Sequence, residues 1–304
     1  MTSRKTQGKF SLRAAFPSVP PKEITQDAFD IAPKHLRRLV QLRPGDRAQV
    51  RDLWEYTQDL QHTEIQVPLL GYLLPFCLEA WREDLRGISS EHGGFVEHFY
   101  PVLANRHVID GHLTPHQSAA VSEFMRESIL EEIDDQRGLT FRGAGARPYR
   151  WVTALTTYGV LLPDVDRLWT SWWSIETIGR AIATLQYTSC LMYPANENPL
   201  FHPWTPERGG GPPTLWEYGG HLYAHRWLEV NVRFLRQILN TQEVSHVVTR
   251  AVERLVGQPE CEPAVDVQAD LPLCVETLAA RCDELPRLLE ANSGTWGPLH
   301  EWTK

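Results

Sequence analysis

Apolar residues recur at steps of three and four along most of this 304-residue chain, and stretches in which apolar and polar residues alternate are nearly absent. The first spacing gathers side chains on one face of an α-helix, whereas alternation gathers them on one face of a β-strand. Only the short stretch Val265–Val267 alternates at all. We therefore predict an all-α fold, a compact array of about eight to ten helices.

The clearest predicted helix runs from Thr114 to Gln136. Thr114 and Gln117 fit a capping box at its start. Pro115 occupies the first helical position, and Gly138 follows the end. The other predicted helices are Pro33–Leu42, Asp46–Leu60, Val67–Leu85, Phe95–Ala104, Tyr149–Leu162, Asp164–Leu191, Thr214–Leu239, Val244–Val256 and Leu273–Ala291.

Two of these segments have features that bear on packing. The segment Asp164–Leu191 is apolar around its whole circumference, which predicts a central helix covered on several sides. Within it, Gly179 and Ala183 leave room for another backbone to come close. In the segment Val67–Leu85, Pro75 is expected to kink the helix or split it in two.

Charge divides the chain into three expected parts. Residues 1–32 form a basic arm, because residues 1–21 hold four cations and no acid. We expect this arm to be solvated, or alternatively to pack on the body or on a partner through Phe10, Leu12 and Phe16. Residues 33–256 form the main helical domain. Residues 257–304 form an acidic linker and a C-terminal helix packed on that domain, with eight acids against two arginines in residues 257–291.

Composition removes several functional classes. The net charge of −8 argues against nucleic-acid binding and against binding to an anionic membrane, both of which depend on Lys and Arg. No apolar run reaches the roughly 18 residues of a membrane span. The five cysteines contain no C-x-x-C pair, so a disulfide framework or a zinc ribbon is not indicated. These features together predict a cytoplasmic protein with reduced thiols.

Short catalytic signatures are also missing from the sequence. It contains no phosphate-binding G-x-x-x-x-G-K-[ST] loop, no G-x-S-x-G elbow and no H-E-x-x-H zinc motif. The run Arg142–Ala146 lacks the third glycine of a dinucleotide fingerprint. Because all-α enzymes often lack short signatures, their absence leaves open whether this chain is an enzyme.

A row of four polar residues is the best catalytic candidate. Glu217, His221, His225 and Glu229 follow one another at steps of four, which places them along one side of the predicted helix. The pair His221 and His225 can chelate one divalent metal, with a carboxylate completing or orienting the site. The competing interpretation is a solvated helix face on which Glu217 forms a capping box with Thr214.

A glycine-rich loop leads directly into the same predicted helix. Arg208 and the three glycines Gly209, Gly210 and Gly211 are the residue types that let a helix start bind an anion. The alternative is a flexible turn in which proline sets the direction of the helix. Because this loop and the histidine row adjoin, we predict one ligand-binding region that also includes the flanking Trp204 and Trp216.

Eleven tryptophans are many for a protein of this size. Trp169, Trp172 and Trp173 share one turn of a predicted helix, where such spacing usually marks core. A Trp-rich surface that binds a planar ligand or a partner's helix is the alternative.

Two functional hypotheses follow from these observations. The favoured one is a non-catalytic protein–protein interaction or assembly component. The other is a helical metal-dependent or acid–base enzyme, or a ligand-binding protein, with its pocket near residues 207–229. A protein partner is predicted, whereas a membrane or a nucleic-acid partner is not, and no cofactor beyond a divalent metal is suggested.

Overall fold

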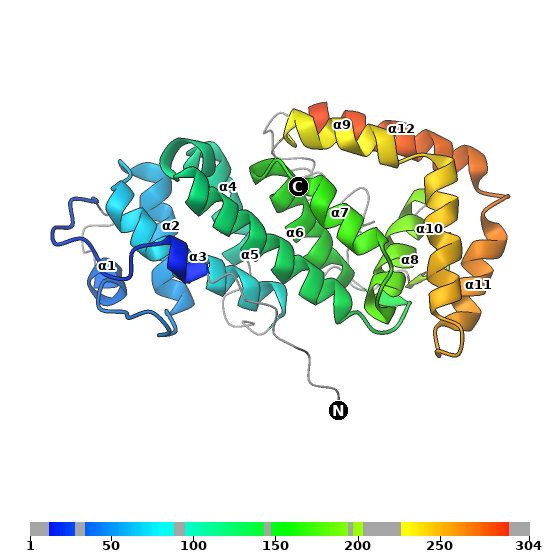
Figure 1. Ribbon diagram of the computed structural model, residues 1–304, viewed down its shortest axis with the longest axis horizontal. Helices are drawn as coiled ribbons and strands as arrows, with labels where there is room; N and C mark the ends of the chain where they lie inside the picture. Colours follow the sequence, from blue (N-terminus) through cyan, green and yellow to red (C-terminus); the bar gives the residue numbers. More distant parts are fainter. Residues whose placement is uncertain are drawn as a thin grey trace, which may run out of the picture. The chain divides into compact units, whose positions relative to one another are not determined.

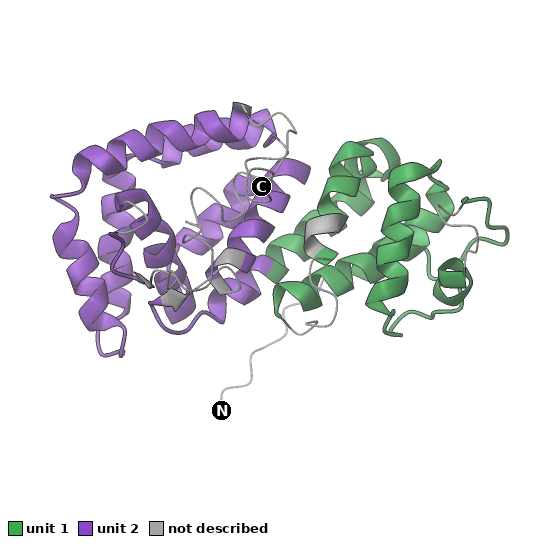
Figure 2. Ribbon diagram, turned by 180° about the vertical axis from the view of Figure 1, so that it is seen from behind, with its two compact units in different colours: residues 1–128 green, residues 129–304 purple. Residues whose placement is uncertain are grey.

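In the residues that it describes, the computed structural model shows an array of twelve α-helices and two short strands (Figure 1). It describes residues 12–27, 34–87, 95–142, 147–193, 197–202 and 226–291. The predicted all-α fold is confirmed. Within the described ranges, no helix is both long and apolar enough to cross a lipid bilayer. The chain forms two compact units, residues 1–128 and 129–304 (Figure 2).

Unit 1 is built around an almost wholly buried helix, α3 (Val67–Leu85). It packs against α2 and α4, and α2 in turn packs against α1. The last helix, α5, contributes its first part to unit 1 and the remainder to unit 2. The other elements of unit 1 are the 3₁₀ turn η1 (Leu12–Ala15), α1 (Lys34–Leu39), α2 (Val50–His62), α4 (Phe95–Asn105), the π-helical turn η3 (Val108–His112) and the beginning of α5 (Pro115–Asp134).

Helix α3 continues through Pro75, so the expected split does not occur. Proline removes one backbone hydrogen bond and crowds the preceding turn. Ten consecutive residues around it, from Leu69 to Leu78, are nevertheless buried. Because burial of apolar area stabilises a helix in proportion to that area, packing on all sides outweighs the lost hydrogen bond.

The start of α5 has the predicted capping box. The backbone N–H of Gln117 donates to Thr114 Oγ1 at 3.3 Å, and the backbone N–H of Thr114 donates to Gln117 Oε1 at 3.0 Å. Pro115 is the first helical residue, and Gly138 follows the helix with a positive φ of 74°. Both ends of this helix are thus encoded locally.

Part of the basic arm packs on the body of unit 1. Leu12 and Phe16 are buried. Between them, Arg13 donates to Glu79 at 2.9 Å and 2.5 Å, and its guanidinium lies 3.7 Å from the ring centre of Phe76. Because Phe76 and Glu79 belong to α3, residues 12–16 follow the alternative in which the arm packs on the body.

Unit 2 surrounds a central buried helix, α8 (Ile178–Met192), as the sequence predicts for this part of the chain. It packs against α6, α7, α10, α11 and α12. The two strands form a single parallel pair in which Phe141 lies opposite Phe201. The other elements are β1 (Phe141–Arg142), α6 (Arg147–Leu161), α7 (Val165–Trp173), β2 (Phe201–His202), α9 (Glu229–Ile238), α10 (Thr241–Arg254), α11 (Cys261–Asp270) and α12 (Val275–Ala291).

The predicted single helix Asp164–Leu191 is wrong, because the chain breaks between α7 and α8. Ile175 has a positive φ of 56°, and Thr177 caps α8 by accepting from the backbone N–H of Arg180 at 3.1 Å. The break brings Trp172 and Tyr187 together, with ring centres 5.3 Å apart. In one straight helix these residues would be separated by about 22 Å along the axis.

Gly179 supports the close backbone approach predicted for it. A Cβ atom at this position would lie 2.4 Å from the carbonyl oxygen of Ile133 and 2.3 Å from that of Asp134. The end of α5 therefore packs directly on the first turn of α8. Only glycine leaves the space for this contact.

The acidic connection expected before the last helix contains a helix of its own, α11. Ala264 and Val267 are buried at a spacing of three, and the buried Leu271 continues the pattern. The high acid content predicts a linker, and this prediction is wrong for residues 261–270. Three small or apolar residues at helical spacing are enough to pack a short helix against the unit.

Candidate functional site

The predicted glycine loop and Glu/His row lie almost wholly outside the described residues, so the site proposed there remains a prediction. Within the described residues, no group of three His, Cys, Asp or Glu side chains is arranged to hold a metal. The predicted site residues that lie outside are Trp204, Arg208, Gly209, Gly210, Gly211, Trp216, Glu217, His221 and His225.

Glu229 is the one predicted site residue that the structure describes. It is the first residue of α9, it is exposed, and its carboxylate accepts from Arg233 at 2.7 Å. Residues 226–228 are not helical, so the predicted helix Thr214–Leu239 is wrong in this part. Glu229 therefore does not continue a row from His225 along one uninterrupted helix.

The tryptophans of the described chain belong to the core, with one exception. Trp169, Trp172 and Trp173 are at most 5% exposed, in agreement with the interpretation of helical spacing as core. Trp54 of α2, by contrast, is 40% exposed. The other buried members are Trp81, Trp151 and Trp227.

A recess of about 690 Å³ lies beside α1 and α2 of unit 1, and Trp54 is part of its wall. Its volume falls in the range of about 300–1,000 Å³ that is usual for ligand pockets. Cations, carboxylates and two amides make up most of the remaining wall, so the recess is polar. We call it the α1–α2 hollow.

A buried histidine forms the floor of the α1–α2 hollow. His35 of α1 is 3% exposed, and its Nε2 lies 2.5 Å from Asp59 Oδ2. Its Nδ1 lies 3.3 Å from Glu55 Oε2. Glu55 and Asp59 are one helical turn apart on α2, so both carboxylates reach the same imidazole ring. Both carboxylates lie within ion-pair distance of the imidazole, and we call these three side chains the ion cluster.

A second ion pair joins the same two helices. Arg38 of α1 donates through Nε to Asp52 Oδ2 at 2.7 Å and through Nη2 to Asp52 Oδ1. The hydrogen bond to Asp52 is the largest influence that raises the pKa of Arg38 above its ordinary value. The two-pronged geometry matches a guanidinium to a carboxylate and fixes how α1 lies on α2.

The basic stretch, residues 34–51, forms α1 and leads into α2, and its Lys34, Arg38 and Arg51 line the α1–α2 hollow. Residues 34–51 hold six Lys or Arg against one acid. Arg51 is paired with Glu55 at 3.2 Å. Lys34, Arg37 and Arg43 are exposed, and within the described parts of the chain none of the three forms an ion pair or a side-chain hydrogen bond. These three cations are therefore uncompensated on a protein that is acidic overall.

The α1–α2 hollow was not predicted, although the sequence contains two signals for it. Six cations within residues 34–51 contrast with the overall charge of −8. The acids Asp52, Glu55 and Asp59 follow at spacings of three and four, which places them on one side of a helix. No rule of sequence spacing, however, relates these acids to His35 and the arginine on another helix.

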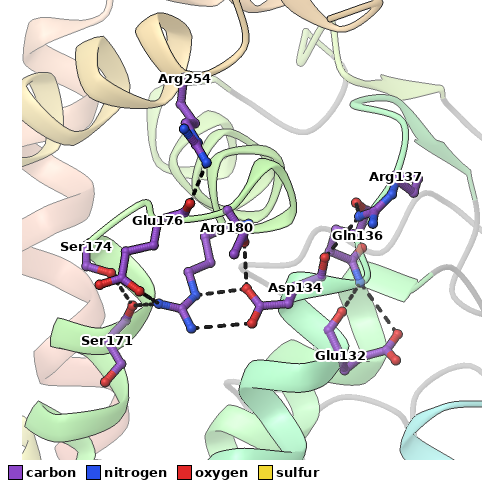
Figure 3. A network of polar contacts seen from close by, with 10 residues as sticks. Glu132, Asp134, Gln136, Arg137, Ser171, Ser174, Glu176, Arg180 and Arg254 are labelled. Carbon is purple, nitrogen blue, oxygen red and sulfur yellow. Dashed lines mark hydrogen bonds and ion pairs between the residues drawn. The ribbon is translucent and has the colours of Figure 1, made fainter. Parts of the chain in front are cut away.

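Unit 2 contains a polar network of a different kind (Figure 3). Arg180 donates to Asp134 at 2.9 Å and to the carbonyl oxygen of Ser171 at 2.7 Å, while Thr177 donates to Asp134 at 2.6 Å. Arg254 donates to the carbonyl oxygen of Glu176 at 2.6 Å. These contacts join the ends of α5, α7 and α10 to the start of α8. The network thus holds helix ends in place, since its charges are directed at other parts of the same unit.

Comparison of the chain with known protein families, with curated proteins and with solved structures finds no match.

Proposed function

We propose that this protein is a non-catalytic interaction or assembly component, and that the α1–α2 hollow binds an acidic segment of a partner protein. One observation carries the proposal. The charged side chains between α1 and α2 are paired with one another, while the indole of Trp54 and Lys34 in the wall of the hollow, and Arg37 and Arg43 in the same basic stretch, are exposed.

The ion cluster supports binding more than catalysis. A general base needs a free lone pair within reach of its substrate. Both ring nitrogens of His35 lie against carboxylates, and the guanidinium of Arg38 is occupied by Asp52. These groups are therefore suited to holding α1 on α2, and the accessible side chains around them are left for recognition.

The exposed side chains of Trp54 and of the basic stretch have the composition of a recognition surface. Tryptophan and arginine are the residue types most enriched among those that dominate binding energy in protein interfaces. Lys34 beside Trp54 in the wall of the hollow, with Arg37 and Arg43 in the same basic stretch, favours a partner that carries Asp or Glu near an apolar side chain. An acidic protein segment suits this surface better than a nucleic acid, because phosphate binding relies on positive charge over a wider area than residues 34–51 provide.

The state of the cysteines agrees with a reducing compartment. All five are free thiols, and Cys77 and Cys282 are buried. We place the protein in the cytoplasm as part of this proposal, because disulfides are rare there.

Affinity capture with matched variants tests the proposed function. Tagged wild-type protein is incubated with an extract of the cells that produce it, and the captured proteins are quantified by mass spectrometry. Arg37→Glu and Trp54→Ala should each reduce recovery of the partner at least about tenfold, as expected when an interface anchor is lost. Arg167→Glu is the matched control, because Arg167 is an exposed arginine of α7 in unit 2.

The proposal is wrong if wild-type protein recovers no partner, or if Arg37→Glu and Trp54→Ala recover the same partners in the same amounts. Circular dichroism of each variant verifies that the helical fold is intact.

A further inference from the structure

Helix α11 of unit 2 presents a face that is only partly polar. Its buried residues Ala264 and Val267 point into the unit, whereas Glu262, Val265 and Asp266 are exposed at spacings of three and four. These three residues therefore share the outward side of the helix. Val265 is 47% exposed, so this outward side of the helix carries apolar area between two acids.

The chain that follows α11 extends this composition. Leu273 is 83% exposed and Val275 is 48% exposed, and the next residue, Glu276, is exposed as well. Within the described residues, Glu262, Asp266 and Glu276 form no ion pair and no side-chain hydrogen bond. We refer to these six residues, from Glu262 to Glu276, as the acidic–apolar face.

The basic stretch, which supplies part of the wall of the α1–α2 hollow, is complementary to this face in composition. Lys34, Arg37 and Arg43 provide three uncompensated cations, and the acidic–apolar face provides three uncompensated carboxylates. Each surface also exposes apolar area, through Trp54 on one side and through Leu273 and its neighbours on the other. Opposite charge around an apolar contact is the pattern that protein interfaces use to select a partner.

The two units also differ in net charge. Unit 1 holds 15 Lys or Arg and 16 acids, whereas unit 2 holds 15 and 22. The basic surface thus belongs to a nearly neutral unit and the acidic surface to a strongly negative one. By net charge, a copy of unit 1 therefore repels unit 2 of another chain far less than a second copy of unit 2 does.

We infer that the acidic partner is a second copy of this chain, whose acidic–apolar face binds the α1–α2 hollow and the exposed cations of the basic stretch. The inference rests on the proposed function and names its partner. Because the two surfaces differ, the contact is head-to-tail, and each added copy leaves one surface of each kind unoccupied at the ends. Such contacts produce open chains or closed rings.

Sedimentation velocity of the purified full-length protein tests the inference. At low ionic strength the average mass should rise with protein concentration. In about 1 M salt, where the Debye length falls to about 3 Å, the association should weaken at least tenfold. Arg37→Glu disables the basic surface and Asp266→Arg disables the acidic one, so each variant alone should remain monomeric.

Mixing these two variants gives the most specific result. Arg37→Glu protein still has an intact acidic–apolar face, and Asp266→Arg protein still has an intact hollow. The mixture should therefore form dimers and stop there, because the remaining surfaces are both disabled. Arg167→Glu, the matched control in α7, should associate like the wild-type protein.

Two results would overturn the inference: a wild-type protein that stays monomeric at all concentrations, or a mixture no heavier than its separate components. Either can coexist with capture that depends on Arg37 and Trp54, in which case the partner is a different acidic protein and the proposed function stands. Capture that is independent of Arg37 and Trp54 contradicts the proposed function itself.

Discussion

Unit 1 and unit 2 hold their helices together by different means. In unit 1, α1 is fixed on α2 by the ion pairs of His35 with Asp59 and of Arg38 with Asp52. In unit 2, α6, α7 and α8 meet through aromatic rings, with the ring centres of Trp151, Trp169 and Trp172 between 5.3 and 6.3 Å from that of Tyr187.

The difference explains why the candidate site lies in unit 1. Aromatic rings contribute large apolar area and stabilise most when fully covered, so the cluster in unit 2 exposes almost nothing for recognition. At the α1–α2 junction, the paired charges extend from the surfaces of two helices toward one another. Their neighbours in sequence, such as Lys34, Arg37 and Trp54, are exposed. The polar junction thus leaves charged side chains at the surface, whereas the aromatic cluster is buried.

The largest expected effect is the loss of an aromatic ring from unit 2. Trp172→Ala should lower the free energy of unfolding by about 4 kcal/mol, because it leaves a cavity at the centre of the cluster. Denaturant unfolding followed by circular dichroism measures this change. Trp54→Ala, at a half-exposed tryptophan, should cost less than about 1 kcal/mol.

Trp172→Phe gives a sharper control. The indole N–H groups of Trp151, Trp169 and Trp172 are buried and have no hydrogen-bond acceptor within the described residues. Phenylalanine keeps a ring and removes such an N–H, so this variant should cost clearly less than alanine. Equal stability of Trp172→Ala and Trp54→Ala would show that the cluster does not stabilise unit 2.

The second effect concerns the ion pairs of unit 1. Asp59→Ala should cost about 3 kcal/mol, because it leaves the buried imidazole of His35 without its closest carboxylate. The double variant His35→Leu with Asp59→Leu should be more stable than Asp59→Ala, since no buried charge is left unpaired. If the double variant is instead the less stable one, the ion cluster stabilises unit 1 more than apolar packing can. Arg51→Ala, which breaks an exposed pair, should cost at most about 1 kcal/mol.

A third comparison uses one glycine in each unit. Gly179→Ala in unit 2 should cost about 2 kcal/mol, because its Cβ would overlap backbone atoms of α5. Gly71→Ala in unit 1 should be neutral or stabilising, because its Cβ would meet Pro17 at an ordinary 3.6 Å and alanine favours the helix. Thermal unfolding of both variants decides the matter, and a change of the same sign in both would contradict the packing described for Gly179.

The smallest effect is on thiol chemistry at alkaline pH. Burial raises the pKa of Cys282 to about 12, and it also raises that of Cys77. An unfolded thiol loses its proton near pH 9, so the free energy of unfolding should fall as the pH rises from about 9 toward about 12. Cys282→Ala should reduce that fall.

The same two thiols report on the units separately. Because the thiolate is the reactive form, alkylation of either cysteine at pH 8 should be slow in the folded protein. Trp172→Ala should accelerate labelling of Cys282 in unit 2 more than labelling of Cys77 in unit 1, and Asp59→Ala should do the reverse. Peptide mass spectrometry after a labelling pulse measures both rates, and equal acceleration would show that the two kinds of junction do not act locally.

Much of the fold was predictable because helix formation depends on neighbours in sequence. The capping box of Thr114 and Gln117, the buried course of α8 and the core position of Trp169 all follow from spacings of three and four. The break at Ile175 was not predictable, because it takes effect only when α7 folds back onto α8. The same holds for α3, in which packing maintains a helix that Pro75 weakens.

The candidate site also separates what local sequence specifies from what depends on tertiary packing. The sequence by itself determined an all-α chain, the capped start of α5, the glycine contact at Gly179 and the core position of Trp169, Trp172 and Trp173, since each depends on local periodicity or on the size of one residue. Only the tertiary structure decided that His35 meets Asp59, 24 positions away, and that a recess with an exposed indole forms beside them. Which faces of two helices meet depends on the packing of the whole unit, and no spacing within either helix specifies it.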